Sequence, residues 1–300
     1  MTWVRAIRLI RHGTPLVEQN IPEPVPHDGE MLIEIRAAGI CHSDAHYRSE
    51  PGRVILPRTL GHEIAGINAA TGERVAVHYL QANGDMIGKE RDGGYAEKIV
   101  VPAESAIPIP GHLSFEEAAI MMCSTATAYH ALRLANLQGN EFLAILGFGG
   151  LGFSALQLAQ KMGVAAVYVA ERVPEKLALA AKLGAVPGLP EGMDVALDFA
   201  GNAALCLDAL RALRRGGRLV LVAINLRELR IDAYADVLAK ERCIIGCSDH
   251  TRDELLELMQ MKLDLSPAIT RRVPLEAHAV NAVLDDLDKG THHLRTVIVR

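Results

Sequence analysis

The 300-residue chain has few aromatic residues and no excess of basic charge. Tryptophan, tyrosine and phenylalanine make up only 4% of the sequence, although 50% of it is hydrophobic. Its apolar content therefore lies mainly in alanine, leucine and valine, which suits an α/β protein with close helix–sheet packing. The formal net charge is −5, whereas binding to nucleic acid or to an anionic membrane needs a basic face. We therefore expect neither of these partners.

The sequence also lacks a long hydrophobic run and a regular set of cysteines. No segment approaches the roughly 18 consecutive apolar residues of a membrane-spanning helix. Three arginines interrupt residues 1–13, so we do not expect this segment to be a signal peptide. The five cysteines are irregularly spaced, and an odd number cannot all pair within one chain. A reducing, cytoplasmic location is therefore expected.

Two patterns divide the chain. Residues 1–110 contain short alternating segments such as 31–38, bounded by glycine and proline, which predict a compact antiparallel barrel or sandwich. Ser114 and Glu117 then form a capping-box sequence that opens a helix expected to reach Ala135. Beyond it, strands and helices alternate, which predicts a parallel sheet with helices on both faces. The expected strands are 141–147, 165–171, 193–199, 217–224 and 243–247.

A glycine-rich loop follows the first of these strands. Gly147, Gly149 and Gly152 form a G-x-G-x-x-G pattern that also includes Gly150 and opens a helix. In dinucleotide-binding folds such glycines allow a tight turn, close approach to a pyrophosphate and packing of helix on strand. The helix N-terminus adds free N–H groups for phosphate oxygens. Glycine-rich turns are common, but here the next strand ends in Glu171, where a carboxylate reaches ribose hydroxyls. We therefore expect a dinucleotide site.

The residues around Glu171 bear on the choice of cofactor. A carboxylate there favours NAD, because the 2′-phosphate of NADP would meet like charge. Arg172 opposes this argument, since an arginine can stack on adenine or accept a phosphate. Lys176 either reaches the ribose or is an ordinary solvated lysine. We expect NAD and leave NADP as the alternative.

Reactive side chains are concentrated in the segment CHSDAH, residues 41–46. Beyond this segment lie His62 with Glu63, and then Cys123 within the helix that Ser114 opens. Two cysteines and a histidine suit zinc, with a fourth position open to a substrate oxygen. A single cysteine on a helix is, however, more often a small buried apolar residue. The spacing alone therefore leaves both interpretations of Cys123 open.

Together these motifs resemble those of zinc-dependent alcohol dehydrogenases of the medium-chain dehydrogenase/reductase superfamily, over nearly the whole chain. The resemblance implies an α/β architecture with a GroES-like β-rich catalytic domain at 1–124 plus 249–300. A Rossmann domain at 125–248, with a doubly wound parallel sheet, would be inserted into it. The matching segments are AAGICHSD (37–44), GHEIAG (61–66), CSTATAYHAL (123–132), GFGGLG (147–152) and LRTVIV (294–299).

The resemblance implies a metal site. Cys41, His62 and Cys123 would bind a catalytic zinc, and Glu63 would lie close enough to approach the metal. Asp44 would hold the metal-binding imidazole. Family members commonly bind a second, structural zinc through four closely spaced cysteines. The corresponding segment, 77–99, contains no cysteine, so we expect one catalytic zinc per subunit and no structural zinc.

The resemblance also implies roles in proton transfer and cofactor binding. Ser43 would take the alcohol proton and His46 would pass it to solvent. His42 is expected near the cofactor pyrophosphate, Thr127 near the nicotinamide and Arg295 near the phosphates. The implied reaction is the oxidation of an alcohol, or the reduction of the matching aldehyde or ketone. Polyols, sugars or amino-acid alcohols are alternative substrates, and a homodimer or homotetramer is the expected assembly.

Two alternative functions lie outside this family. LIRHGTP, residues 9–15, matches the opening of histidine phosphatases, whose RHG histidine lies where a strand leads into a helix. Three prolines within 16–30 prevent a helix here, so we expect His12 in a surface turn. A non-catalytic nucleotide sensor on the same fold is the other alternative. The proton-relay residues argue against it, because a sensor does not need a proton path.

Overall fold

The computed structural model of the protein describes residues 2–290 and 293–300. The chain divides into two compact units. The first unit combines Met1–Cys123 with Leu255–Arg300, and the second is the continuous stretch Ser124–Glu254. The domain boundaries expected at 124/125 and 248/249 stay a prediction. In the part of the chain that the structure describes, the helices are too short or too polar to cross a membrane.

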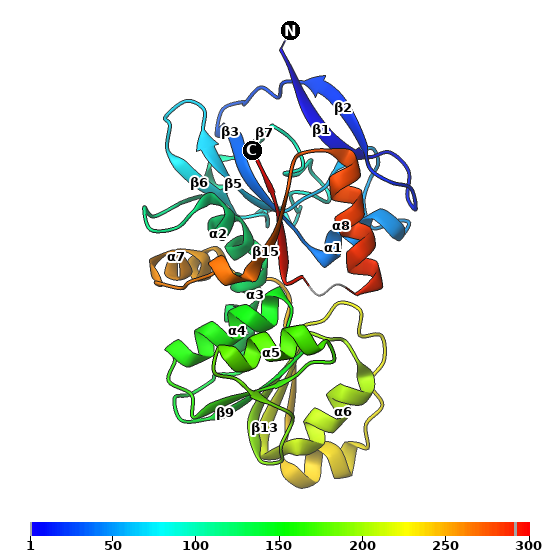
Figure 1. The fold of residues 1–300 in the computed structure, drawn as a ribbon, viewed down its shortest axis with the longest axis vertical. Coiled ribbons are helices and arrows are strands. Elements are labelled where there is room, and N and C mark those ends of the chain that lie inside the picture. The colour runs from blue at the N-terminus through cyan, green and yellow to red at the C-terminus, as the bar shows by residue number, and fades with distance from the viewer. Residues whose placement is uncertain (1, 291–292) are drawn as a thin grey trace. The chain divides into compact units, whose positions relative to one another are not determined.

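Strands dominate the first unit (Figure 1). One sheet has the order β2-β1-β4, and a second has the order β15-β16-β3-β5-β6-β8, with β7 also pairing with β3. The long strand β3, Glu30–Ile40, is central to the second sheet, and β16 pairs with it in antiparallel register, Thr296 opposite Ile40. The other strands are β1 Trp3–Leu9, β2 Val17–Pro22, β4 Arg58–Thr59, β5 Glu63–Asn68, β6 Arg74–Val77, β7 Lys98–Pro102, β8 Ala106–Pro108, β15 Ile269–Val273 and β16 Arg295–Val299.

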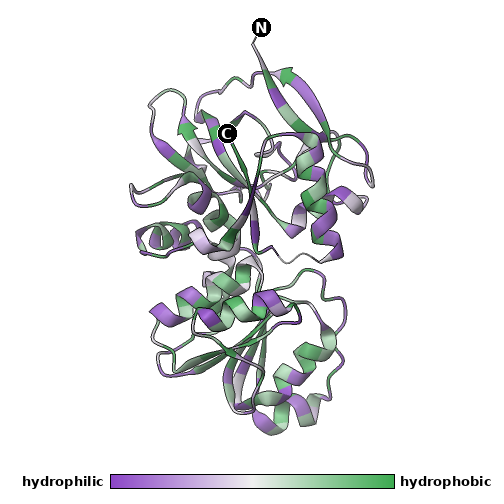
Figure 2. Cartoon of the chain, viewed as in Figure 1, coloured by the Kyte–Doolittle hydropathy of each residue, from purple (hydrophilic) through white to green (hydrophobic). Residues whose placement is uncertain are grey.

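Few helices accompany these strands. In α8, Ala277–Lys289, hydrophobic and hydrophilic residues alternate along the helix (Figure 2), and the apolar side buries Val280, Val283 and Leu284. This face packs against the core that also contains β3. The other α-helices in this unit, or entering it, are α1 His42–Ser49, α2 Phe115–Ile120 and α7 Arg252–Gln260, and short 3₁₀ turns lie at Ala103–Ser105 and Ser266–Ala268.

The RHG segment lies in the turn between β1 and β2. A strand therefore follows it, where a histidine phosphatase needs a helix. The backbone N–H of Gly13 donates a hydrogen bond of 2.8 Å to the carbonyl of Arg48 on α1. The segment is thus a structural turn, as expected for His12.

The second unit is built on a six-stranded parallel sheet with the order β11-β10-β9-β12-β13-β14. Numbered from β9, this order is 3-2-1-4-5-6, which is the Rossmann arrangement. Right-handed crossovers place α4 and α5 on one face and α6 on the other, and these helices flank the sheet in Figure 1. The strands are β9 Phe142–Leu146, β10 Ala166–Ala170, β11 Val186–Pro187, β12 Met193–Asp198, β13 Leu213–Leu221 and β14 Cys243–Gly246; the helices are α3 Ala126–Leu134, α4 Gly150–Lys161, α5 Pro174–Lys182 and α6 Ala203–Ala212, with a π-helical turn at Ala233–Val237 and a 3₁₀ turn at Leu238–Lys240.

The fold class expected from the sequence is confirmed, but one helix differs. Ser114 caps α2 as expected, because its hydroxyl accepts a hydrogen bond from the backbone N–H of Glu117. The continuous helix expected as far as Ala135 is instead interrupted by a π-helical turn, Met121–Thr125. Such turns are rare and frequently lie at functional sites. This one contains Cys123.

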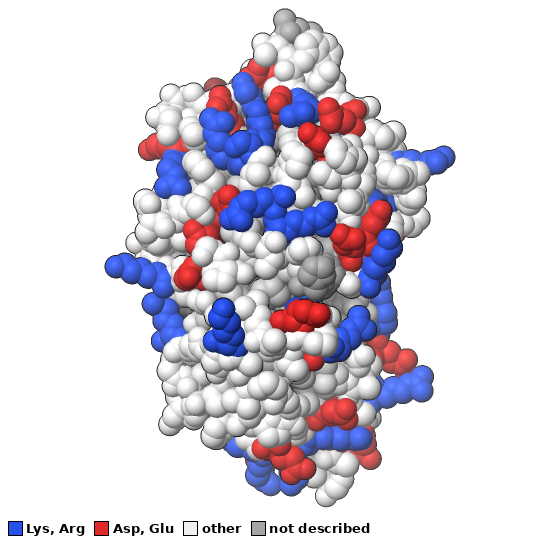
Figure 3. Space-filling model, viewed as in Figure 1, with Lys and Arg blue, Asp and Glu red and all other residues white. Residues whose placement is uncertain are grey.

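Acidic and basic side chains are mixed on the face of the molecule drawn in Figure 3. Lysines and arginines lie among aspartates and glutamates there. This mixture agrees with the small net charge of −5.

The glycines of the loop after β9 differ in what surrounds them. Gly147 has φ +92° and lies against Ala200, which follows β12. A side chain at Gly152 would overlap the carbonyl oxygen of Gly147. Gly149, by contrast, has no atom within 4 Å of the position that a β-carbon would occupy. Gly147 and Gly152 are therefore needed by the protein itself, whereas the space at Gly149 is open.

We expect Gly152→Ala to destabilise the protein and Gly149→Ala to have little effect. The added methyl group at position 152 meets rigid backbone, and overpacking of this kind costs about 1–3 kcal/mol. At position 149 it enters open space, so the change should stay within about 1 kcal/mol. Urea unfolding of the cofactor-free variants measures both values. Equal stabilities would show that the close packing at Gly152 is wrong.

Candidate active site

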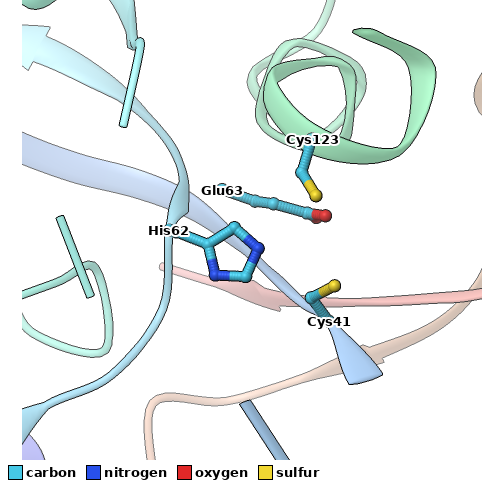
Figure 4. Close-up of side chains that lie close together, drawn as sticks. All are labelled: Cys41, His62, Glu63 and Cys123. Carbon is cyan, nitrogen blue, oxygen red and sulfur yellow. The ribbon is translucent and has the colours of Figure 1, made fainter. Parts of the chain in front are cut away.

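Three distant segments of the first unit bring four possible metal ligands together. Cys41 lies between β3 and α1, His62 and Glu63 lie at the start of β5, and Cys123 lies in the π-helical turn. Their ligand atoms all lie within 4.8 Å of one another, and all four residues are buried. Figure 4 shows the four side chains pointing toward a common point. The residues expected to bind zinc are thus neighbours in the fold.

The pKa values of the two thiols of this cluster are shifted in opposite directions. A hydrogen bond from Cys123, helped by His62, lowers the pKa of Cys41 well below its ordinary value. The pKa of Cys123 is raised by its hydrogen bond to Cys41 and by burial. Cys41 is therefore the group that loses its proton first. A thiolate is the form in which cysteine binds metal.

Asp44 connects His62 to the start of α1. Its carboxylate is fully buried and accepts a hydrogen bond of 3.0 Å from the backbone N–H of Cys41. Oδ1 lies 3.5 Å from Nδ1 of His62. Burial alone would lower the pKa of His62, but Asp44 and Cys41 raise it well above its ordinary value. Because Nδ1 faces Asp44, Nε2 is the ring nitrogen left for a metal.

Glu63 forms a buried ion pair with Arg295 of β16. Burial raises the pKa of Glu63 to about 7, although Arg295 opposes this shift. A side chain at Gly39 would overlap the carboxylate of Glu63, so glycine is needed at that position of β3. The structure thus places Arg295 beside the metal cluster. Its expected contact with cofactor phosphates stays a prediction.

The cluster fits zinc on the chemistry of its donors. Two sulfurs and an imidazole are the ligand types that zinc prefers, and Asp44 supplies the carboxylate that commonly orients such an imidazole. Oε1 of Glu63 is buried and has no hydrogen-bond partner among the described residues. A buried carboxylate oxygen without a donor favours a cation nearby.

The residues expected to carry a proton lie on α1. Oγ of Ser43 is 3.5 Å from Sγ of Cys41. One turn further along, the ring of His46 stacks on that of His42 with centroids 4.7 Å apart. Burial and then His42 lower the pKa of His46, while Glu50, 3.5 Å away, opposes them. His46 is therefore a neutral imidazole near pH 7, able to accept a proton.

The expected cofactor residues of the second unit surround the glycine loop. Glu171 accepts hydrogen bonds from the backbone N–H groups of Phe148 (2.7 Å) and Val173 (2.8 Å). A carboxylate offers about four lone-pair sites, so two remain for other donors. Burial, opposed by Glu171, lowers the pKa of Lys176. Arg172 is exposed just after β10. Glu171, Arg172 and Lys176 thus place three charged side chains where a ribose is expected.

Thr127, expected near the nicotinamide, lies half-buried in the first turn of α3 in the second unit. Two tyrosines of the first unit contact the metal-ligand cluster or its neighbour Asp44 without having been identified from the sequence. Tyr95 and Tyr79 were not expected. The hydroxyl of Tyr95 donates a hydrogen bond of 2.8 Å to Asp44, and the ring of Tyr79 meets that of His62 edge-on at 5.1 Å. Only the Gly-Gly pair before Tyr95 hinted at close backbone packing.

Known proteins resemble the chain in both sequence and fold. The family described as the alcohol dehydrogenase GroES-like domain matches residues 27–111. An alcohol dehydrogenase of Geobacillus stearothermophilus is 32% identical over 95% of the chain and 96% of that relative. An NAD-dependent alcohol dehydrogenase of Sulfurisphaera tokodaii is 33% identical over 79% of the chain and 76% of that relative.

A solved structure extends the likeness to the fold. It is a protein of Sinorhizobium meliloti 1021 described as a zinc-binding dehydrogenase, with NADP bound. Its TM-score is 0.89 at 24% identity, over 100% of both chains. The sequence relatives, which span nearly the same length as the chain, establish the family. The protein therefore belongs to the zinc-type alcohol dehydrogenases of the medium-chain dehydrogenase/reductase superfamily, oxidoreductases that exchange a hydride between an alcohol, or the matching carbonyl compound, and a nicotinamide cofactor.

Proposed function

We propose that the protein works with one catalytic zinc per subunit, held by Cys41, His62 and Cys123, and with NAD as the preferred cofactor. The observation that carries this proposal is the buried meeting of two thiols, an imidazole and a carboxylate within 4.8 Å. Zinc bound there supplies a Lewis acid, which makes the proton of an alcohol easier to lose. The expected homodimer or homotetramer and the cytoplasmic location stay predictions.

The residues on α1 would then move the proton. Ser43 lies beside a metal-binding sulfur, so its hydroxyl is suited to receive the proton of an alcohol bound at the cluster. His46 lies one helical turn away and is neutral near pH 7, because burial and His42 lower its pKa. It can accept the proton and release it to solvent. The hydrogen bonds of Asp44 fix the segment from which Ser43 and His46 project.

NAD is supported by the charge around the ribose position. Glu171 keeps two backbone N–H groups in place and retains lone pairs for the ribose hydroxyls. A 2′-phosphate would bring a further negative charge to this carboxylate. Arg172 and Lys176 are the groups that favour NADP. The relative from S. tokodaii is described as NAD-dependent, whereas the S. meliloti structure holds NADP.

The purified protein should contain about one zinc ion per subunit. Replacing Cys123 by serine should lower the zinc content and abolish alcohol-dependent NADH formation, because a thiolate ligand is lost. Cys206→Ser is the matched control. Cys206 is fully buried on α6, and burial with Asp198 raises its pKa to about 12, so it remains a packed thiol. Elemental analysis decides: two zinc ions in the wild type would contradict the single site.

Glu171→Ser should weaken the use of NAD and improve that of NADP. The change removes a charged acceptor for the ribose and the repulsion of a 2′-phosphate. Loss of such a hydrogen bond corresponds to about a 10-fold fall in kcat/KM for NAD. Glu175→Ser is the control, because it removes an exposed carboxylate from the first turn of α5. It should change neither kcat/KM for NAD nor kcat/KM for NADP. A wild-type preference for NADP of about 10-fold would show that Arg172 dominates.

Ser43→Ala and His46→Gln should impair proton transfer in different ways. Ser43 is at the end of the path beside Cys41, so its loss should abolish activity at every pH while zinc and NAD still bind. His46 is at the outer end, where hydroxide or small bases can replace it. The loss in His46→Gln should be about 100-fold or less, and it should shrink as the pH rises or imidazole is added. A pH–rate profile parallel to that of the wild type would remove His46 from the path.

A further inference from the structure

One carboxylate connects both metal-binding segments to a tyrosine. Asp44 accepts hydrogen bonds from the backbone N–H of Cys41 at 3.0 Å and from that of Gly61 at 3.2 Å. A third comes from the hydroxyl of Tyr95 at 2.8 Å. Its Oδ1 is 3.5 Å from His62 Nδ1. Asp44 thus lies between Cys41 and His62, and Tyr95 is the one donor among these hydrogen bonds that comes from a side chain.

Tyr95 is fully buried, and both its ring and its backbone are held in place. A side chain at Gly61, which has φ +94°, would overlap the Tyr95 ring. The ring therefore packs on the residue that directly precedes His62. The backbone N–H of Tyr95 donates to Leu60 at 3.0 Å, and its carbonyl accepts from Ile7 at 2.7 Å. These contacts leave the hydroxyl little freedom except toward Asp44.

The two glycines before Tyr95 explain how the segment comes so close. Gly93 donates to the carbonyl of Thr59 at 2.8 Å, and Gly94 donates to that of Gly61 at 2.7 Å. A side chain at Gly93 would overlap the carbonyl oxygen of Gly61. The Gly-Gly-Tyr sequence, residues 93–95, thus packs closely against the loop that carries His62. It belongs to the cysteine-free segment 77–99.

The hydroxyl of Tyr95 stays a donor over the working pH range. Burial, followed by the nearby Asp44, raises its pKa well above the ordinary value. A fully buried carboxylate needs its donors, because water does not reach it. Removing one donor should loosen the carboxylate and, through it, the imidazole. Partners of metal-binding histidines typically change metal affinity about 10- to 100-fold when they are removed.

We propose that Tyr95 is a positioning residue of the metal site: its hydroxyl holds Asp44, which in turn orients His62 toward the two cysteine sulfurs. This inference rests on the proposed function only in requiring that a metal binds Cys41, His62 and Cys123. It adds one residue to the pair formed by Asp44 and His62.

The test is zinc affinity, measured by chelator competition on the metal-free full-length protein. Tyr95→Phe keeps the ring and the backbone hydrogen bonds, so the metal-free variant should keep the wild-type circular dichroism spectrum. Its zinc affinity should fall about 10-fold. Tyr47→Phe is the matched control. It removes the hydroxyl of another buried tyrosine of the same core cluster, and it should bind zinc as the wild type does.

A double-mutant cycle separates positioning from a general loss of packing. If Tyr95 acts through Asp44, Tyr95→Phe should lower zinc affinity by less than about 2-fold when Asp44 is already alanine. The visible spectrum of the Co²⁺-loaded protein, which reports ligand geometry, should shift in Tyr95→Phe and not in Tyr47→Phe.

Two outcomes overturn the inference in distinguishable ways. The role of Tyr95 is refuted if Tyr95→Phe binds zinc as tightly as the wild type, or if it lowers zinc affinity by the same factor with Asp44 and with alanine at position 44. The metal site itself would then still stand. Wild-type protein that binds no zinc refutes the proposed function, and the role of Tyr95 with it.

Discussion

The buried carboxylate of Asp44 is the contact on which the metal cluster depends. Cys41 and His62 belong to different segments, and their thiol and imidazole must meet in a space from which water is excluded. Hydrogen bonds to one carboxylate hold these two segments together. A site held in place in this way would lose little conformational entropy on binding a metal ion. Glycines at 39, 61 and 93 remove the side chains that would keep the segments apart.

In the second unit, glycines serve a different purpose: they expose backbone N–H groups. A parallel sheet that reverses its strand order between β9 and β12 opens a crevice at their carboxyl ends. Backbone N–H groups must line this crevice without side chains in front of them. Gly147 and Gly152 let the loop fold closely on itself, whereas Gly149 leaves space for a ligand. Glu171 then accepts a hydrogen bond from Phe148, so the acidic residue expected to face the ribose also stabilises the loop.

Much of this fold follows from local patterns in the sequence. The capping box at Ser114 and the strand–helix alternation after it are local patterns, which residues close in sequence determine. They correspond to the start of α2 and to the Rossmann sheet with its helices. The expected metal ligands were found through family motifs, and the fold brings them together. Tyr95 and the pairing of Arg295 with Glu63 were not foreseen, because each contact joins residues far apart in the chain. The π-helical turn at Cys123 was also missed, since residues 114–135 have an ordinary helical pattern.

The pairing of β16 with β3 has a consequence for the order in which the protein matures. Because β16 follows β3 far along the sequence, the edge of β3 with which it pairs stays open during synthesis until β16 has been made. Cys41, His62 and Cys123 are all translated long before it. Arg295, which neutralises Glu63, comes only with this strand. Until then, the nascent chain contains the thiols expected to bind zinc together with a glutamate that lacks its ion-pair partner.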